Sequence, residues 1–427
     1  MYFSLRRILL ISLLVLYAPT SRSELIIEIT KGIETAVPIA VVPFGGGGGA
    51  AVNISSVVQA DLNRSGLFKT LAERDMLTRP TEAAKVRYRN WQALGQEYLV
   101  IGQVNKVEGR YQVQFQLFDI YKGEQLLGYR LTVSAKALRR TAHHISDLVY
   151  EKLTGKKGVF STRIAYVTST KKSNDKKNYK LLVADADGFN PRIITSSIEP
   201  LMSPAWSPDG KKIAYVSFEN KRAAIFIQTL ATGKRERIAR YKGINGAPAF
   251  SPDGSRLALT LSKDGSPDIY VLNLKNKSLL KVTKSYGIDT EPTWSPDGKT
   301  IVYTSDRGGK PQLYSIPSIG GRARRLTFDG DYNARGRFSS DGKSIAMVHA
   351  NRGDYRIAVM DMATRTINVL TAGRYDESPS FSPNGDMLLY AARKGKRGVL
   401  SAVSIDGRMQ QNLAFASGEV REPAWSP

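Results

Sequence analysis

The chain has 427 residues, a formal net charge of +24 and no cysteine. Its length allows two or three domains, or one large repeat architecture beside a smaller domain. The lack of cysteine excludes disulfides, thiolate metal sites and a cysteine nucleophile, and with only three histidines we expect neither a histidine zinc site nor a cofactor.

The first residues have the features of a secretory signal peptide. Arg6 and Arg7 precede an apolar stretch of about ten residues, 8–17, which is shorter than the roughly 20 that a membrane-spanning helix needs. Ser21 and Ser23 then occupy the −3 and −1 places of a cut before Glu24. We predict a signal peptide at 1–23, no membrane span in the mature chain and a periplasmic location; the alternative is a short membrane anchor.

Export changes the meaning of the positive charge. In an exported protein it argues against nucleic acid and towards anionic envelope surfaces or acidic partners. Basic runs such as 171–177, 322–325 and 393–397 lie between apolar runs. We interpret them as solvated loops and as edge strands that charge protects from pairing with other chains.

Residues 24–155 are predicted to form a small α/β domain. Strict alternation of apolar and polar residues over 111–120 predicts a half-buried strand. Apolar residues at helical spacing predict two helices, which Gly66 and Gly155 terminate. The expected elements are strands at 38–44, 98–104, 111–120 and 126–134, and helices at 54–62 and 136–153.

Five consecutive glycines, 45–49, follow the first of these strands. A strand, a glycine-rich turn and a helix N-terminus can cradle a phosphate. No Gly-Lys-Ser/Thr follows here, however, so we interpret the stretch as a flexible loop.

An aromatic residue recurs before a turn at nearly constant spacing in the rest of the chain. Successive copies are 44, 44, 44, 43 and 44 residues apart, at Trp206, Phe250, Trp294, Phe338, Phe381 and Trp425. Each copy reads roughly P-x-(W/F)-S-P-(D/N)-G and precedes a short apolar run. Four short antiparallel strands per repeat of this length predict the blades of a β-propeller.

The repeated turn has a physical basis. In the copy at 207–210, Pro208 presets its own φ, Asp209 tolerates the next position and Gly210 takes the left-handed conformation at the end. The turn therefore joins two antiparallel strands tightly. We interpret its aspartates as structural rather than catalytic.

The chain ends on "EPAWSP", which is an opening strand without the rest of its unit. The first unit, which begins near residue 159, has the opposite defect, because it lacks an opening strand. We predict that the C-terminal strand completes this first blade. Residues 158–427 would then form a six-bladed propeller with no exposed inner edge.

Six connections between blades are predicted to surround one mouth of the propeller channel. They contain Met202, Asn245, Thr290, Glu291, Arg335, Asp376, Glu377, Arg421 and Glu422. Four of the nine are acidic in a strongly basic chain, which favours a docking mouth for a protein partner over scattered loop polarity. No G-x-S-x-G nucleophile motif occurs, and we predict no enzymatic activity.

These motifs resemble those of the TolB family, the periplasmic propeller proteins of the Tol-Pal system. The stretches "PLMSPAWSPDG" (200–210), "NGAPAFSPDG" (245–254) and "TEPTWSPDG" (290–298) are very similar to that family, as is "EITKGIETAVPIAVVPF" at the mature start. The likeness covers nearly the whole mature chain, with both domains in order. The five-glycine loop and the high net charge depart from it.

The resemblance implies a non-catalytic adaptor, monomeric outside its complexes. Such an adaptor docks the lipoprotein Pal at the propeller mouth and the inner-membrane protein TolA through its mature N-terminal segment. By carry-over that segment is Glu24–Gly32, with contacts expected at Glu24, Ile26, Glu28 and Thr30. Its alternation suits packing on its own domain or addition to a partner's sheet. Outer-membrane integrity and constriction at cell division are the implied processes.

A second hypothesis is a propeller that binds an anionic envelope glycan or polymer through its basic rim. Binding of that kind weakens steeply with ionic strength, whereas docking by shape persists.

Overall fold

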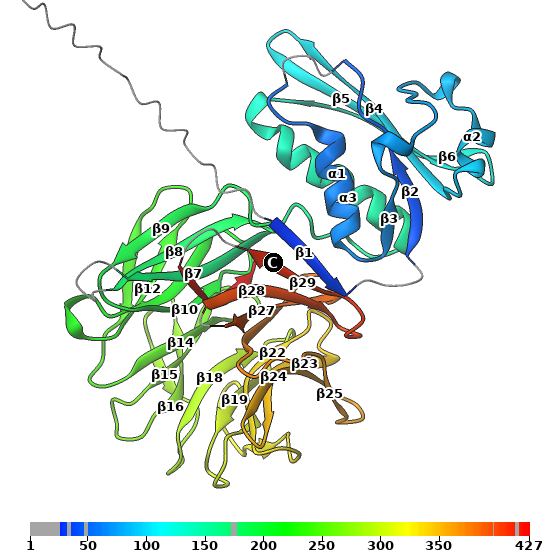
Figure 1. The fold of residues 1–427 in the computed structure, drawn as a ribbon. Helices are drawn as coiled ribbons and strands as arrows, with labels where there is room; N and C mark the ends of the chain where they lie inside the picture. Colours follow the sequence, from blue (N-terminus) through cyan, green and yellow to red (C-terminus); the bar gives the residue numbers. More distant parts are fainter. Residues whose placement is uncertain (1–25, 32–35, 47–49, 172–176, 396, 415–417) are drawn as a thin grey trace, which may run out of the picture.

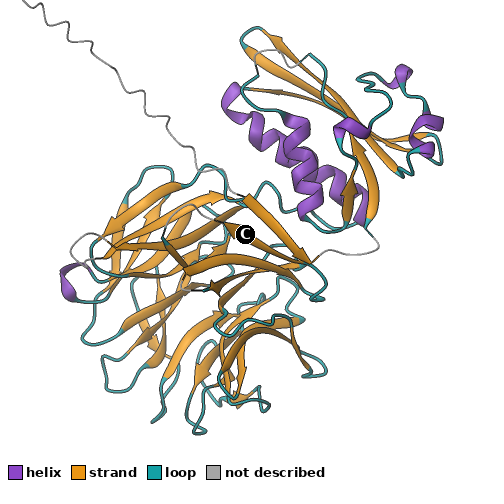
Figure 2. Cartoon of the chain, in the orientation of Figure 1, coloured by secondary structure: helices purple, strands orange, loops and turns teal. Residues whose placement is uncertain are grey.

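The computed structural model describes residues 26–31, 36–46, 50–171, 177–395, 397–414 and 418–427. It contains a small α/β domain and a large domain made almost entirely of strands (Figures 1 and 2). The predicted signal peptide and Glu24 lie outside the described residues, as do Gly47, Gly48 and Gly49 of the five-glycine stretch.

The small domain is a five-stranded sheet with two helices on one face. Its strands, in spatial order, are β3 (Phe68–Thr70), β2 (Val37–Val41), β4 (Tyr98–Val107), β5 (Arg110–Asp119) and β6 (Glu124–Val133). Its helices are α1 (Ile54–Arg64), α2 (Tyr88–Ala93) and α3 (Leu138–Thr154), with the short 3₁₀ turns η1 (Glu73–Asp75), η2 (Ala83–Lys85) and η3 (Ala135–Ala137). The predicted elements are all present, with ends shifted by a few residues.

Unequal burial of the two faces of this sheet explains the alternation along β5, in which buried apolar residues alternate with half-buried glutamines. The helices α1 and α3 bury Val58, Leu62 and Ile145 against one face. The other face is covered by Trp91 of α2, whose side chain is fully buried. Gly155, with φ 74°, ends α3 in the left-handed conformation that glycine adopts without steric cost.

The large domain is a six-bladed β-propeller in which each blade is a four-stranded antiparallel sheet. From innermost to outermost strand, the first two blades are blade 1, β30 (Glu419–Trp425), β7 (Arg163–Lys171), β8 (Lys177–Asp185) and β9 (Arg192–Ser197), and blade 2, β10 (Leu201–Trp206), β11 (Lys212–Ser217), β12 (Ala224–Thr229) and β13 (Arg235–Ala239). The next two, in the same order, are blade 3, β14 (Asn245–Phe250), β15 (Arg256–Leu261), β16 (Asp268–Asn273) and β17 (Leu279–Lys281), and blade 4, β18 (Asp289–Trp294), β19 (Thr300–Ser305), β20 (Gln312–Pro317) and β21 (Arg324–Arg325). The last two are blade 5, β22 (Tyr332–Phe338), β23 (Ser344–Asn351), β24 (Asp354–Asp361) and β25 (Ile367–Val369), and blade 6, β26 (Glu377–Phe381), β27 (Met387–Lys394), β28 (Arg397–Ser404) and β29 (Gln410–Ala414). Blade 2 also carries the 3₁₀ turn η4 (Glu219–Lys221).

The C-terminal strand closes the ring, as the sequence predicts. Strand β30 pairs antiparallel with β7, with Trp425 opposite Ile164 and Glu419 opposite Ser169. The indole nitrogen of Trp425 donates to Thr162 Oγ1 at 2.8 Å. One sheet therefore contains strands from both ends of the propeller sequence, and blade 1 has no open inner edge.

Buried apolar side chains lie between neighbouring blades rather than in one central core. One such cluster contains Tyr215 and Phe226 of blade 2 together with Ala165 and Leu181 of blade 1. Each blade thus buries a face against the next, which holds the ring together.

Strand β1 (Ile26–Lys31) extends blade 6 to five strands. It pairs antiparallel with β29, with Ile27 opposite Leu413 and Glu28 opposite Asn412. Figure 1 shows it along the outer edge of the propeller, next to β29. The expected packing on its own domain thus takes a different form, because the segment joins the propeller and not the sheet of the small domain.

Candidate partner-binding site

The six innermost strands line a channel of about 360 Å³. We call its two ends the base, where the Ser-Pro-Asp-Gly turns lie, and the mouth, where the chain crosses from one blade to the next. Each innermost strand runs from the mouth towards the base, because the connection precedes it in the sequence and the turn follows it. The mouth is the end at which the sequence predicts docking.

A ring of six left-handed residues occurs at the same place in each innermost strand. None of them is glycine, although positive φ is uncommon for other residues. They are Ser203 (φ 52°), Ala247 (45°), Glu291 (56°), Arg335 (56°), Ser378 (57°) and Glu422 (51°). All six coincide with a register shift in pairing to the next strand, which is the mark of a β-bulge.

Three of the bulges tie their blade to the preceding one. The amide of Arg335 donates to Thr304 Oγ1 of blade 4 at 3.1 Å, and that of Glu291 donates to Thr260 Oγ1 of blade 3 at 3.3 Å. The amide of Ser203 donates to Glu422 Oε2 of blade 1. The unusual backbone thus contributes to ring closure and also lines the channel.

Charged side chains of opposite sign meet at this ring. Glu291 Oε1 lies 2.7 Å from Arg335 Nε, and these side chains are only 18 % and 26 % exposed. Arg335 also donates from Nη1 to Ser378 Oγ of the next blade. The channel therefore contains a preorganised ion pair on two neighbouring blades, which a hydrogen bond ties to a third.

Burial and these neighbours shift the pKa values of the ring. Burial raises the pKa of Glu422, and the attraction of Arg335 only partly opposes it. Burial also acts to lower the pKa of Arg335, but Glu291, Glu422 and Glu377 outweigh it, so this pKa is raised. Arg335 therefore stays charged, whereas Glu422 takes up a proton more readily than a free glutamate does.

Large apolar side chains project to solvent around the mouth. All of them are at least 36 % exposed, and Tyr286 is fully exposed: Ile198, Met202, Tyr241, Ile244, Tyr286, Ile288, Phe328 and Tyr375. We call these eight residues the apolar rim. They lie on five consecutive connections between blades or, in the case of Met202, just beyond one. Gathered apolar residues of this kind mark interaction surfaces on soluble proteins.

The sequence profile of the TolB beta propeller domain matches residues 150–427, and that of the TolB amino-terminal domain matches residues 25–126. The chain belongs to the TolB family. It is 62% identical to the Tol-Pal system protein TolB of Nitrosococcus oceani, over 96% of this chain and 95% of that protein. It is 61% identical to the protein of the same name from Methylococcus capsulatus, over 97% of each chain.

A solved TolB structure has the same fold over nearly the whole chain. The crystal structure of TolB from Acinetobacter baumannii superposes with a TM-score of 0.88 at 46% identity, covering 95% of this chain and 100% of that one. Both domains of the TolB family are thus present here in their usual order.

The residues predicted at the mouth of this TolB-family propeller have different surroundings. Met202 is 37 % exposed and belongs to the apolar rim. Thr290 is half-buried, and its hydroxyl lies 3.3 Å from that of Thr260. Glu377 is half-buried beside Asp376. Glu291, Arg335 and Glu422 form the charged ring.

Two of the predicted residues support loops. Asn245 is 1 % exposed, and its side chain bonds the amide and the carbonyl of Tyr241 and the carbonyl of Gly243. Asp376 is 3 % exposed, and burial raises its pKa. Both side chains shape the connections that carry the apolar rim.

Sequence reasoning found only Met202 of the apolar rim and missed the other seven residues. Single exposed apolar residues are common, so Ile244 or Tyr286 gives no signal on its own. The signal that could have revealed them is their recurrence, because every rim residue lies within ten residues before a repeated aromatic-Ser turn.

The predicted N-terminal contacts fall on or next to β1. Ile26 and Glu28 pair with Ala414 and Asn412, whereas Thr30 lies at a register shift between Ile29 and Lys31. The segment therefore already adds a strand to a sheet, and that sheet belongs to its own chain.

The small domain contacts the base of the TolB-family propeller. Lys156 Nζ lies 2.6 Å from Asp386 Oδ1, and Tyr150 donates to the other oxygen of that carboxylate at 3.2 Å. At Gly66 the chain passes so close to Met409 of blade 6 that a Cβ atom would lie 2.1 Å from its sulfur. The base is thus covered on one side, and the mouth lies at the opposite end.

No catalytic constellation was predicted. His349 lies within strand β23, and its Nδ1 is 2.8 Å from Asn333 Oδ1. None of the helices in the described part of the chain combines the length and apolar character that would let it span a bilayer.

Proposed function

We propose that this chain is a non-catalytic adaptor of the Tol-Pal system in the periplasm. It docks Pal at the propeller mouth and TolA through its N-terminal segment. In this role it maintains outer-membrane integrity and supports envelope constriction at cell division. Family membership over both domains supports this assignment.

The mouth carries the main part of the proposal. A protein partner needs an apolar surface for affinity and fixed charges for register. The apolar rim supplies the first, and the ion pair of Glu291 with Arg335 supplies the second. Because the ring already holds these side chains in place, a docked partner loses little free energy in ordering them.

Strand β1 suits the second contact. It is the outermost strand of a five-stranded sheet and pairs with one neighbour, β29. An edge strand can leave its own sheet and add to another one, using the same backbone hydrogen bonds. TolA then competes with β29 for β1, and the chain alternates between two states whose populations a ligand can shift.

The mouth is tested by titrating purified soluble Pal domain into the chain and measuring heat. A double variant, Ile244→Glu with Ile288→Glu, should weaken binding at least about tenfold, because it puts charges into an apolar contact. The matched control is Ile319→Glu, which changes a 76 % exposed isoleucine on the turn after β20, at the base end. Equal affinity of the double variant and the wild type would refute docking at the mouth.

An engineered disulfide that holds β1 on β29 tests the proposed contact with TolA. The chain has no cysteine, so Glu28→Cys with Asn412→Cys introduces a single pair at directly opposed positions. Oxidised, this variant should lose TolA binding and keep Pal binding, and reduction should restore the first. Undiminished TolA binding by the oxidised form would refute release of β1.

Salt separates this proposal from binding of an anionic polymer. Pal affinity should change little between low and high ionic strength, because exposed charges contribute little to an apolar contact. A steep loss of affinity with salt would favour the basic surface as the docking site.

A further inference from the structure

A buried cluster of charged side chains lies where the small domain meets blade 1. Helix α1 contributes Asp61 and Arg64, and α3 contributes Arg139 and His143. The turn between β8 and β9 contributes Asp187, which comes from the propeller. His143 is 2 % exposed, Asp61 is fully buried and Asp187 is 7 % exposed. This cluster plays no part in the proposed docking of Pal or TolA.

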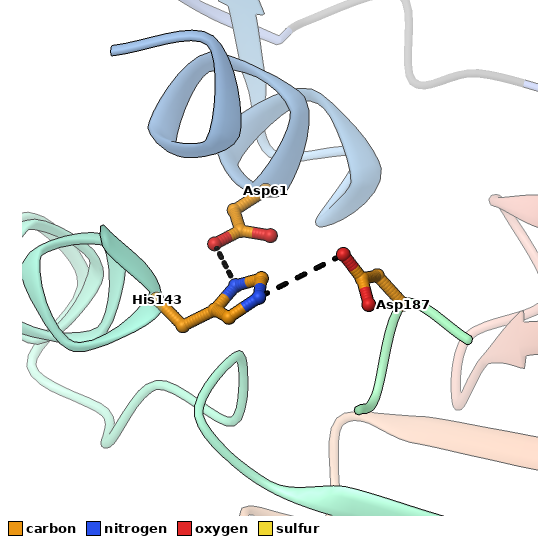
Figure 3. Close-up of side chains that lie close together, drawn as sticks. All are labelled: Asp61, His143 and Asp187. Atoms are coloured by element: carbon orange, nitrogen blue, oxygen red, sulfur yellow. Dashed lines mark hydrogen bonds and ion pairs between the residues drawn. The ribbon is translucent and has the colours of Figure 1, made fainter. Parts of the chain in front are cut away.

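The imidazole of His143 lies between two carboxylates (Figure 3). Its Nδ1 is 2.7 Å from Asp61 Oδ2, within the small domain. Its Nε2 points at Asp187 Oδ2 across the domain boundary, 3.7 Å away, and has no hydrogen-bond partner among the described residues. Buried polar atoms normally have partners, so this nitrogen calls for an explanation.

The arginines already bond both carboxylates. Arg64 Nη2 lies 2.7 Å from Asp61 Oδ1, and its Nη1 lies 3.9 Å from Asp187. Arg139 donates to Asp187 and lies 3.9 Å from Asp185. Burial acts to raise the pKa of Asp187, but Arg64, His143 and Arg139 outweigh it and lower this pKa. Asp187 is therefore a stable carboxylate facing the histidine.

His143 lies among charged groups of both signs. Asp61, Asp185 and Asp187 carry three negative charges, whereas Arg64 and Arg139 carry two positive ones. Further away, Asp147 on α3 interacts with Asp61, and Arg163 on β7 and Arg192 on β9 interact with Asp185. One more carboxylate than arginine therefore lies in the immediate surroundings of the imidazole, and the outer groups balance that excess.

A metal ion fits this geometry less well than a proton. Ligand atoms of Asp61, His143 and Asp187 do lie within 4.8 Å of one another. However, the two carboxylates face opposite nitrogens of one ring, so a single ion on either nitrogen has only one of them beside it. The arginines would also repel a cation and already bond these oxygens.

We propose that His143 is a pH-sensitive latch between the small domain and the propeller, which protonation of Nε2 closes on Asp187. In the neutral form a ring lone pair faces a carboxylate, and the contact is repulsive. In the protonated form Nε2–H donates to that carboxylate, which adds a charge-assisted hydrogen bond across the boundary. Mild acid therefore strengthens docking of the small domain, and alkali weakens it.

The size of the effect follows from linkage. If docking takes up one proton, its equilibrium constant changes by up to about tenfold for each pH unit. Histidine is the side chain whose charge changes between about pH 5 and 8, so docking is measured from pH 8 to pH 5.5.

The test measures separation of the domains in urea at several pH values. Because the chain has no cysteine, Lys122→Cys with Lys299→Cys places one exposed label on each domain. Pulsed electron resonance then gives the distance between the labels. In this background the urea midpoint of separation should rise as the pH falls from 8 to 5.5. With His143→Asn it should be independent of pH, because the amide lacks a titrating group.

His144 supplies the matched control, since it is the next residue on α3 and is exposed. His144→Asn should retain the full pH dependence. Asp187→Asn leaves the small domain unchanged and should abolish the pH dependence of domain separation. This variant tests the latch if His143→Asn does not fold. A wild-type midpoint that is constant or falls in acid overturns the latch, as does pH dependence that persists in His143→Asn. Stabilisation by added Zn²⁺ at pH 8 that His143→Asn abolishes overturns it in favour of a metal site.

Discussion

Different features of the repeat recur at the two ends of the propeller. At the base, five turns repeat one hydrogen bond, from a serine hydroxyl to the side chain two residues later, with lengths between 2.5 and 2.8 Å. At the mouth, six residues repeat one left-handed backbone and one bulge, but their side chains differ: Ser203, Ala247, Glu291, Arg335, Ser378 and Glu422.

This difference separates what builds the ring from what the ring presents. A bond that recurs in five turns serves the blade itself, because every blade needs the same tight connection. At the mouth only the backbone recurs, so side chains can vary without loss of closure. We therefore expect changes at the base to affect stability and changes at the mouth to affect binding.

The largest expected effect on stability comes from removing β30, the strand that closes the ring. A chain that ends at Gly418 lacks β30, which leaves the inner edge of β7 without a partner strand and takes away the carbonyl of Ala424 that bonds Trp206. We expect loss of cooperative unfolding in urea, or a cost above about 5 kcal/mol, measured by tryptophan fluorescence.

Deleting β1 is the control, because it too removes one strand, but from the outer edge of blade 6. That variant should unfold cooperatively near the wild-type midpoint. Equal losses in the two deletions would mean that the inner strand is not special.

The two tryptophans where the ring closes, Trp206 and Trp425, should differ in how much their replacement destabilises the chain. Trp206 is 9 % exposed and donates to Ala424 at 3.0 Å, so Trp206→Ala should cost about 3–5 kcal/mol. Trp425 is only partly buried, so its replacement by alanine should cost less free energy of unfolding than Trp206→Ala. We expect about 2 kcal/mol from Trp425→Ala. Urea unfolding at pH 7 measures both, and a larger cost at Trp425 would reverse the comparison.

The base was largely predictable from the sequence, because its information is local. A serine, a proline, an acidic residue and a glycine in succession specify the turn, and the aromatic residue before them sets the register. The C-terminal opening strand without the rest of its unit then predicts that the ring closes through blade 1. The helices and strands of the small domain were predictable for the same reason, from the period of their apolar residues.

The mouth and the domain boundary were not predictable, because their contacts join residues that the sequence does not relate. Nothing local indicates that Arg335 pairs with Glu291, one blade away, or that His143 faces Asp187 of another domain. The pairing of β1 with β29 joins two segments that lie far apart in the sequence. An alternating strand shows that it needs a partner, but not which one.

The base turn of blade 6 has an amide where the other base turns have an aspartate, and this amide contacts the small domain. In the turn of blade 6, Asn384 replaces the usual aspartate, and its Nδ2 donates to the carbonyl of Lys157 at 2.9 Å. Asn384→Asp would place a carboxylate oxygen against that carbonyl. We expect docking of the small domain to weaken by about 1–2 kcal/mol, measured as the urea midpoint of domain separation.

The control for this variant is Asp341→Asn, the opposite change in the equivalent turn of blade 5. That turn has the same internal hydrogen bonds, and its replacement should leave domain separation unchanged. If both variants weaken docking alike, the amide of Asn384 has no special role.

The smallest expected effect on stability lies at the mouth. Because the pKa of Glu422 is raised in the folded chain, its protonated form favours folding. The stabilisation from this proton is complete below the unfolded pKa of about 4.3 and is lost as the pH rises through the folded value. Glu422→Gln stays neutral throughout and still offers an acceptor to the amide of Ser203.

We therefore expect Glu422→Gln to raise the free energy of unfolding by less than about 1 kcal/mol at pH 8, and the gain to vanish near pH 4. Urea unfolding at several pH values measures it. Glu236→Gln, on an outer strand where the carboxylate is 61 % exposed, should show no such trend. A loss of stability at pH 8 would mean that attraction to Arg335 exceeds the cost of burial, and that the charged ring helps to hold the propeller closed. The mouth would then share in stability, and the division between the two ends would fail at this residue.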